Sequence, residues 1–289
     1  MSNRNNKILI LGATGMLGNA VFRYFHGSDN FSAVGSIRSS VPPDTWSTAL
    51  CSDVVCNIDV EDEINLRNLF RFVNPDTVVN CVGLVKQLVN SKDPVIAITI
   101  NSLLPHRLAK LCDEWDARLI HVSTDCVFDG KRGLYREEDA SDAKDLYGKS
   151  KYLGEVDYPN AVTLRTSIIG HEINGGHSLV NWFLAQEGTA KGFNRAVFSG
   201  LPTVELARVI RDYVIPNVEL RGVYHVSSDS INKFDLLKLV ATIYEKNIEI
   251  IAEDNLVIDR SLDSSRFRQI TGYKSPAWTD LVRSMRLFA

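Results

Sequence analysis

Tyr147 and Lys151 lie four residues apart in the segment Tyr-Gly-Lys-Ser-Lys. Side chains with this spacing share one face of a helix, so the two are predicted to be neighbours. A phenol with an ordinary pKa of about 10 transfers protons poorly at neutral pH unless a cation stabilises the phenolate. Lys151 can supply that cation and can also hold ribose hydroxyls of a nicotinamide cofactor. On its own, this pattern usually marks an exposed helix face.

A hydroxyl-bearing segment, Ser123-Thr124-Asp125, ends a predicted strand 23 residues before the tyrosine. A hydroxyl at this strand end can hydrogen-bond a substrate carbonyl oxygen and orient it for proton donation by Tyr147. Together with the glycine turn described next, the three side chains predict an acid–base site for carbonyl chemistry.

Three glycines follow the first predicted strand, in Gly12-Ala-Thr-Gly-Met-Leu-Gly18. A dinucleotide diphosphate needs backbone N–H groups at a helix N-terminus and no β-carbons in its way. We expect Gly12 to allow a tight turn, Gly15 to allow phosphate approach and Gly18 to allow close packing of the helix on the sheet. The alternative is a plain strand–helix turn that carries three glycines. The predicted cofactor contacts in this turn are Gly12, Thr14, Gly15, Met16, Leu17 and Gly18.

The segment after the second strand, Ser36-Ile-Arg38-Ser-Ser40, contains an arginine and no carboxylate. An acidic residue there would bind a ribose 2′-hydroxyl, whereas an arginine balances a 2′-phosphate. The sequence therefore favours NADPH, with NADH possible and a solvated arginine as the alternative. Asp59 and Val60 are predicted to border the adenine, although Asp59 could equally cap the helix that follows.

The elements that position these residues alternate between strand and helix. Short apolar runs predict strands at 7–11, 31–37, 54–60, 77–81, 118–123 and 162–165, and helical spacing predicts helices at 19–25, 61–72, 93–115 and 146–156. This order predicts an α/β fold, a Rossmann-type doubly wound parallel sheet with a smaller α/β substrate lobe. We expect residues 1–170 to bind the cofactor and carry the catalytic residues. Residues 171–289 are expected to form mainly the substrate lobe, interleaved with the first part, with helices at 179–186, 203–215, 233–244 and 278–287 and a short strand at 223–226.

The 289-residue composition bounds the function. With 32 Lys+Arg against 35 Asp+Glu, the net charge is −3, which offers no basic field for nucleic acid or an anionic membrane. Five cysteines without a C-x-x-C pair support neither a disulfide framework nor a zinc site, and suit a reducing cytoplasm. The first apolar run, residues 8–11, is too short for a signal segment or a membrane span. No metal site is predicted.

These motifs together resemble the extended branch of the short-chain dehydrogenase/reductase superfamily. The chain is most similar there to dTDP-4-dehydrorhamnose reductases and related reductases of nucleotide-linked 4-keto-6-deoxyhexoses. The matching stretches run in order over about 200 residues: the glycine turn, Asn80-Cys-Val-Gly83, Asn101, Ser123-Thr-Asp-Cys-Val-Phe128, the Tyr147–Lys151 segment, Leu164-Arg-Thr-Ser167 and Gly200-Leu-Pro-Thr203.

The resemblance implies a role for each matching residue. Thr124, Tyr147 and Lys151 would be the catalytic triad, with Tyr147 and Lys151 also on the cofactor. Cys81, Val82 and Gly83 would border the cofactor, and Asn101 would support the lysine through water. The implied substrate-binding residues are Lys86, Thr124, Asp125, Cys126, Arg165 and Ser167; Arg195 is added because a guanidinium matches diphosphate oxygens, with a solvated arginine as an equal alternative.

Three positions depart from the family pattern. Cys81 and Val82 stand where alanines are more usual. Cys126 stands where the rhamnose enzymes usually have tyrosine and the related dehydratases have glutamate, which argues against dehydration. Lys86-Gln87 replaces a His-Thr-like pair near the expected sugar, so an acetamido sugar on UDP fits as well as a deoxyhexose on dTDP.

The expected function is NADPH-dependent reduction of a nucleotide-activated 4-keto-6-deoxyhexose in the synthesis of cell-surface polysaccharide precursors. Tyr147 would protonate the developing alkoxide, Lys151 would lower the pKa of the tyrosine and Thr124 would polarise the carbonyl. The alternatives are a sugar-nucleotide epimerase of the same superfamily and a non-catalytic NADP-binding regulatory subunit. A homodimer is possible. His121, within an apolar strand, is expected to be a core histidine.

Overall fold

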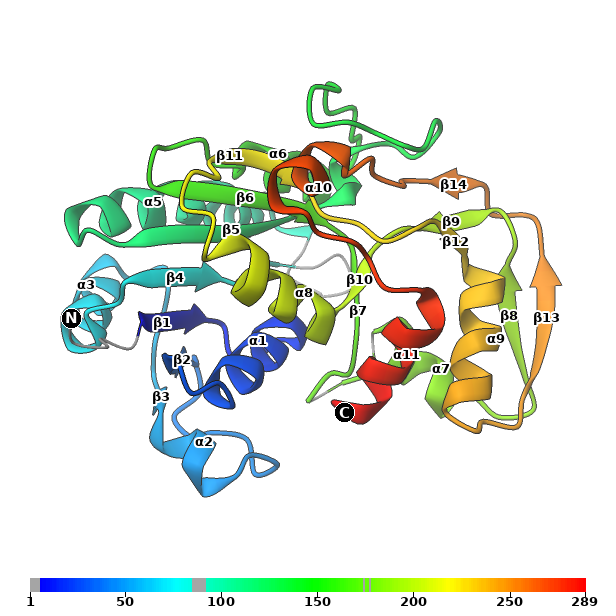
Figure 1. Cartoon of the computed structure of the whole chain (residues 1–289), viewed down its shortest axis with the longest axis horizontal. Helices are drawn as coiled ribbons and strands as arrows, with labels where there is room; N and C mark the ends of the chain where they lie inside the picture. The colour runs from blue at the N-terminus through cyan, green and yellow to red at the C-terminus, as the bar shows by residue number, and fades with distance from the viewer. Residues whose placement is uncertain (1–5, 85–91, 174, 177) are drawn as a thin grey trace.

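The computed structural model describes residues 6–84, 92–173, 175–176 and 178–289. At its centre is a seven-stranded sheet in the order β11-β6-β5-β4-β1-β2-β3 (Figure 1), in which every neighbouring pair is parallel. Its strands are β1 (Asn6–Leu11), β2 (Phe31–Ser36), β3 (Val54–Val55), β4 (Thr77–Asn80), β5 (Arg118–Thr124), β6 (Ala161–Thr166) and β11 (Gly222–His225).

Helices cover both faces of this sheet, which is why its central strands read as continuous apolar runs. In β1, the four side chains from Ile8 to Leu11 have no exposed surface. On one face pack α1 (Met16–His26) and α8 (Thr203–Val209), and on the other α3 (Glu63–Val73) and α5 (Leu104–Glu114). The predicted doubly wound parallel sheet is confirmed.

The third strand is shorter than predicted. Only Val54–Val55 pairs with β2, and Asn57 then takes a left-handed backbone conformation with φ of 59°. Asp59 therefore lies in a loop rather than at a strand end. The next helix begins at Glu63, because the Asp62 side chain accepts hydrogen bonds from the backbone N–H groups of Ile64 and Asn65. The capping role considered for Asp59 is thus wrong.

The long helical pattern at 93–115 is one helical segment of three parts: α4 (Pro94–Ala97), a π-helical stretch (Ile98–Leu103) and α5. The π-helical stretch buries Asn101, and α6 (Leu146–Leu153) crosses close to it. At Gly154, where α6 ends, a β-carbon would lie 1.9 Å from the carbonyl oxygen of Asn101. Glycine at this position permits the close approach of α6 to the π-helical stretch.

The second half of the chain contributes to both parts of the molecule. Strand β11 joins the main sheet beside β6, and α8 packs on α1. The remaining elements form a smaller lobe around a separate core (Figure 1). They are β7 (Ile168–Ile169), α7 (Leu179–Ala185), β8 (Thr189–Phe193), β9 (Ala196–Phe198), β10 (Leu201–Pro202), β12 (Ile231–Asn232), α9 (Lys233–Ile243), β13 (Glu249–Glu253), β14 (Ile258–Asp259) and α11 (Trp278–Leu287). Helix α10 (Ser265–Thr271) instead packs on β11 and adds Phe267 to the core of the main sheet.

Within the described residues, no helix combines the length and apolar character needed to cross a bilayer.

Candidate active site

The glycine turn joins β1 to α1 at the point where the strand order of the sheet reverses, which is where dinucleotides bind in such sheets. Gly12 has φ of +77°, and a β-carbon on Gly18 would lie 2.1 Å from the carbonyl oxygen of Gly12. A β-carbon on Gly15 would meet only that same oxygen, at 3.4 Å. The turn thus has the backbone shape of a diphosphate cradle whose open side is at Gly15, and a dinucleotide fits it.

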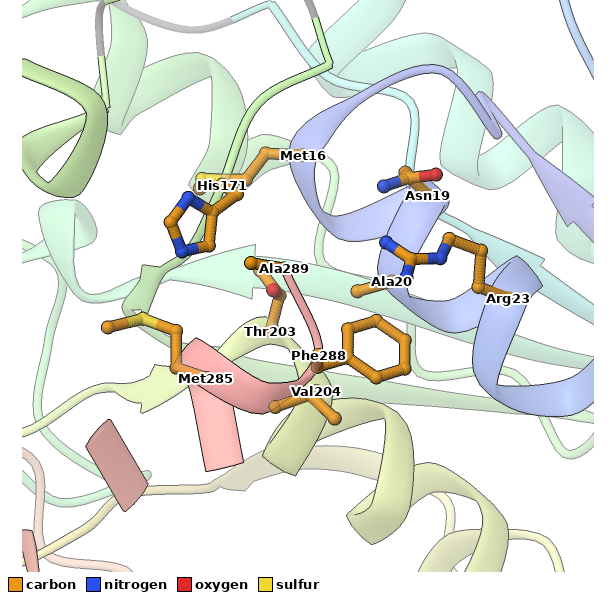
Figure 2. A pocket seen from close by; sticks show the side chains of 10 residues that line it. All are labelled: Met16, Asn19, Ala20, Arg23, His171, Thr203, Val204, Met285, Phe288 and Ala289. Atoms are coloured by element: carbon orange, nitrogen blue, oxygen red, sulfur yellow. The ribbon is translucent and has the colours of Figure 1, made fainter. Parts of the chain in front are cut away.

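The side chains of Leu17 and Met16, next to this turn, pack against other parts of the protein. Leu17 is buried in the core, and Met16 lines a small cavity between α1, α8 and the end of α11 (Figure 2). His171 lines the same cavity and is hydrogen-bonded to the Tyr244 hydroxyl at 2.7 Å. In this arrangement, Met16 can meet a diphosphate through its backbone N–H in the first turn of α1, while its side chain packs against the second half of the chain.

Arg38 and Asp59 lie at the far edge of the same end of the sheet. Both are exposed, and the two segments are joined because the backbone N–H of Ile58 donates to the carbonyl of Ile37. The Asp59 carboxylate accepts a hydrogen bond from the backbone N–H of Glu61, and Val60 packs on the core beneath α3. The two predicted adenosine-end residues therefore occupy neighbouring loops.

The segment after β4 approaches both the glycine turn and Lys151. A β-carbon on Gly12 would lie 3.0 Å from Val82 Cγ2, and one on Gly83 would lie 3.8 Å from Lys151 Nζ. The Asn101 side chain holds this segment by accepting from the backbone N–H of Leu84 at 2.8 Å and donating to its carbonyl at 3.1 Å. It also donates to the hydroxyl of Ser150, on α6.

Helix α6 is fixed at its start by polar and steric contacts. The Asp145 side chain accepts a hydrogen bond from the backbone N–H of Gly148 at 2.9 Å. A β-carbon on Gly148 would lie 2.2 Å from the carbonyl oxygen of Cys126. Only glycine lets the helix lie this close to the end of β5, and this contact brings Tyr147 to Thr124.

Thr124 and Tyr147 are hydrogen-bonded through their side chains. The Thr124 hydroxyl also donates to the Asp125 carboxylate at 3.1 Å and accepts from the backbone N–H of Cys126 at 3.1 Å. Lys151 is buried, and its Nζ donates to the carbonyl of Val122 at 2.8 Å. The structure therefore gathers the predicted triad at the carboxyl end of β5.

Burial shifts the pKa values of Lys151 and Tyr147, and the shift of Tyr147 is opposite to the expected one. Burial lowers the pKa of Lys151 to about 8, against the opposing effects of Glu155 and Cys81. Burial also raises the pKa of Tyr147 above its ordinary value, reinforced by Cys126 and opposed by the hydrogen bond with Thr124. The net shift is therefore upward rather than the expected downward one, because desolvation of the phenolate dominates in this geometry. A protonated tyrosine is the form that can donate a proton.

Two cations that sequence reasoning missed approach the same strand end from the smaller lobe. Arg260 donates to the carbonyl of Phe128 at 2.7 Å, and another of its nitrogens lies 3.8 Å from Cys126 Sγ. Lys233 interacts electrostatically with Asp125 and Cys126, and burial lowers its pKa. Burial raises the pKa of Asp125, and Arg260 and Lys233 oppose that rise.

A sequence signal existed for Lys233 only. It is the first residue of α9, next to the Asn232 cap, where the helix dipole disfavours a cation. Arg260 is 134 residues from Cys126, and no spacing in the sequence connects them.

The other predicted substrate residues are dispersed. Arg165 is 2% exposed, and its guanidinium contacts Glu155 and His225 inside the protein, so this geometry favours a structural role. Ser167 lies at the β6–β7 junction and accepts from the backbone N–H of Leu201. Arg195 is exposed in the turn between β8 and β9. Lys86 lies outside the described residues.

No group of three or more histidine, cysteine, aspartate or glutamate side chains in the described ranges could hold a metal ion. His121 is fully buried and hydrogen-bonded to Asn80 at 3.1 Å.

A Rossmann sheet with a glycine cradle and a Thr–Tyr–Lys cluster defines an extended short-chain dehydrogenase/reductase. The RmlD substrate binding domain matches residues 6–285, and the chain belongs to that family.

Comparison with known proteins gives relatives of two kinds. Methionine adenosyltransferase 2 subunit beta from Danio rerio is 29% identical over 249 residues, covering 81% of this chain and 73% of the relative. The probable low-salt glycan biosynthesis reductase Agl14 from Haloferax volcanii is 32% identical over 165 residues, covering 55% of this chain and 52% of that protein. The fold is shared with dTDP-4-dehydrorhamnose reductase from Bacillus anthracis in complex with NADP, with a TM-score of 0.79, 18% identity and 99% coverage of both chains.

Proposed function

We propose that this protein is an NADPH-dependent reductase of a nucleotide-activated 4-keto-6-deoxyhexose. The observation that carries the proposal is the meeting of Thr124, Tyr147 and Lys151 beside Gly83, on the side of the sheet where the glycine cradle opens. Bound NADPH would supply a hydride to the carbonyl carbon. Its diphosphate would lie on the cradle, and Arg38 would face the 2′-phosphate.

The chain's own groups then handle the carbonyl oxygen. Thr124 orients that oxygen through its hydroxyl, and Tyr147, kept protonated by its raised pKa, donates the proton. The nearby Lys151 ammonium stabilises the phenolate left after transfer. Proton replacement from solvent restores the tyrosine for the next turnover.

The substrate class is supported by the two cations of the smaller lobe. Arg260 and Lys233 are partly buried, and no carboxylate of the described residues lies within ion-pair distance of either. Asp125 acts on both cations electrostatically but forms no ion pair with either. Partly buried cations in this situation favour an anionic ligand, and a nucleotide diphosphate provides one. We accordingly assign residues 171–289 mainly to sugar-nucleotide binding. The five cysteines without a C-x-x-C pair lead us to propose that the reaction takes place in the cytoplasm. dTDP- and UDP-linked sugars both fit this reading.

The test is NADPH oxidation measured against dTDP-, UDP- and GDP-linked 4-ketosugars formed in situ by a dehydratase. Wild-type protein should consume one NADPH per ketosugar, and Tyr147→Phe should lose at least about a hundredfold in kcat while binding NADPH as before. Tyr152→Phe, an exposed tyrosine on the same helix, is the control. Wild-type turnover by Tyr147→Phe would refute the mechanism.

Two other functions remain to be separated by the same assay. A sugar-nucleotide epimerase uses the same side chains but consumes no net NADPH. A binding subunit is favoured by the similarity to methionine adenosyltransferase 2 subunit beta. Cofactor binding without turnover on the whole panel, together with complex formation with a methionine adenosyltransferase, would support that second candidate.

A further inference from the structure

His121 and Asn80 face each other across two neighbouring strands in the centre of the main sheet. In the parallel register of β4 and β5, Asn80 is the partner of His121, and both side chains are buried. Asn80 Nδ2 lies 3.1 Å from His121 Nδ1. Within the described ranges, the other ring nitrogen, Nε2, has no hydrogen-bond partner. Among these residues, the contact with Asn80 is therefore the polar link between this ring and the rest of the protein.

The Asn80 side chain also fixes the backbone where β4 ends. Its Oδ1 accepts a hydrogen bond from the backbone N–H of Val82 at 3.1 Å. An asparagine that binds the N–H two residues further on forms an Asx turn, which bends the chain away from the strand. At this bend Val82 lies against the glycine turn, since a β-carbon on Gly12 would be 3.0 Å from Val82 Cγ2. The Asn80 amide thus sets the start of the segment that approaches both the glycine turn and Lys151.

These two contacts determine where the protons are. A backbone N–H can only donate, so the Asn80 atom that faces Val82 is the oxygen, and the NH₂ group faces His121. His121 Nδ1 must then accept, and in a neutral imidazole the proton lies on the other nitrogen, Nε2. The ring is neutral near pH 7, because burial, reinforced by Lys151 and His106, holds its pKa well below the ordinary value. One tautomer of His121 therefore fits, and it holds the Asn80 amide in one orientation.

We propose that His121 is a positioning residue for cofactor binding, which acts through the Asn80 amide on the backbone of residues 81–83. Its Nδ1 keeps the amide in the orientation that bends the chain over the glycine turn. Without that acceptor, the Asn80 NH₂ group is left unpaired in the core, and the amide is no longer held against Val82. The effect on NADPH rests on the proposed function, whereas the tautomer and the Val82 hydrogen bond can be measured without cofactor or substrate.

The first measurement is the ¹⁵N NMR spectrum of the histidine rings in the intact protein at pH 7, with His121 assigned through its backbone. We expect a protonated Nε2 and an unprotonated Nδ1. In Asn80→Asp, a carboxylate still accepts from Val82 but has no NH₂ group to donate, so His121 Nδ1 should become protonated. A wild-type ring protonated on Nδ1, or a Nδ1 that stays unprotonated in Asn80→Asp, would overturn the proposal.

The second measurement compares variants by NADPH affinity, from the fluorescence of the cofactor, and by hydrogen exchange of the Val82 amide. His121→Phe removes the acceptor, whereas His121→Asn keeps one, its side-chain oxygen, near the position of Nδ1. We expect His121→Phe to weaken NADPH binding and to speed Val82 exchange, each by about tenfold. In His121→Asn both quantities should change by less than about threefold.

Thr163→Val is the matched control, because Thr163 is the partner of His121 on β6, the strand on its other side. The Thr163 hydroxyl is bonded to the backbone N–H and carbonyl of Val156, so its removal disturbs the same layer of the sheet without touching residues 81–83. NADPH binding and Val82 exchange should stay within about threefold of the wild type.

Equal effects of His121→Phe and Thr163→Val would show that only the stability of the sheet matters, and the proposal would then be wrong. Unchanged Val82 exchange in His121→Phe would overturn it as well. If His121→Phe does not fold, the wild-type tautomer is the deciding result. Failure of the wild-type protein to bind NADPH would count against the proposed function, and the tautomer and the Val82 exchange would still decide this inference.

Discussion

The Nζ of Lys151 donates a 2.8 Å hydrogen bond to the carbonyl oxygen of Val122, two residues before Thr124. This bond runs from α6 to β5 and sets the position of the ammonium relative to the Thr124 hydroxyl, which the proposed function assigns to the substrate carbonyl. One carbonyl occupies only one of the three donors of an ammonium group. The other two are what the proposed function uses for ribose hydroxyls, and the charge state of Lys151 therefore decides how activity depends on pH.

The pKa of Lys151, lowered by burial to about 8, predicts an alkaline limit. The amine is charged below that pH and neutral above it, so kcat/KM should be level from pH 6.5 to 7.5 and about tenfold lower at pH 9. The measurement is a pH profile of ketosugar reduction at saturating NADPH. Lys149→Met, which removes an exposed lysine from the same helix, should keep this profile. The idea fails if Lys151→Met retains the same alkaline limb.

Gly18→Ala should disrupt the cofactor cradle. Its β-carbon would lie 2.1 Å from the carbonyl oxygen of Gly12, so α1 must move away from the sheet. We expect a loss of about 1–3 kcal/mol in the free energy of unfolding, measured by urea denaturation. We also expect weaker NADPH binding, measured by the fluorescence of the cofactor. At the other end of α1, a β-carbon on Gly27 would meet nothing closer than 3.6 Å, and Gly27→Ala is the control. Equal behaviour of the two variants would contradict the packing argument.

Arg260 and Arg195 offer a direct comparison between a cation found by the structure and one predicted from sequence. Arg260 is anchored on Phe128 next to Cys126, whereas Arg195 is exposed in a turn. Arg260→Met should raise the KM for the sugar nucleotide by roughly ten- to a hundredfold, and Arg195→Met should change it less than about threefold. The KM for NADPH should stay the same in both. A larger effect at Arg195 would restore the original prediction.

Arg38 should set the choice between the two nicotinamide cofactors. In the proposed complex the 2′-phosphate of NADPH would gain a charge-assisted contact from the arginine that NADH lacks, and the segment Ser36–Ser40 carries no carboxylate to bind a free ribose hydroxyl. Arg38→Ser should reduce the ratio of kcat/KM for NADPH over NADH by roughly tenfold, which corresponds to about 1.4 kcal/mol. Steady-state kinetics with both cofactors measure it. An unchanged ratio would show that Arg38 is only a solvated loop residue.

Local patterns predicted much of this fold because each depends on nearby residues. The continuous apolar run at residues 8–11 is what a strand covered on both faces requires, and the structure gives all four side chains no exposed surface. The prediction of a strand up to Val60 was wrong because an apolar run cannot reveal a left-handed residue such as Asn57 or show where a neighbouring strand stops. Asp62, rather than Asp59, caps the next helix, because its side chain reaches two backbone N–H groups.

The sequence by itself determined the glycine turn, the i, i+4 relation of Tyr147 and Lys151, and the doubly wound sheet, because backbone geometry and hydrophobic periodicity act over short distances. Only the tertiary structure decided which charges meet. It brought Arg260 and Lys233 to Asp125 and Cys126, enclosed Arg165 with Glu155, and raised the pKa of Tyr147 that sequence reasoning expected to fall. Burial and contacts between distant segments set these outcomes, and neither can be read from spacing along the chain.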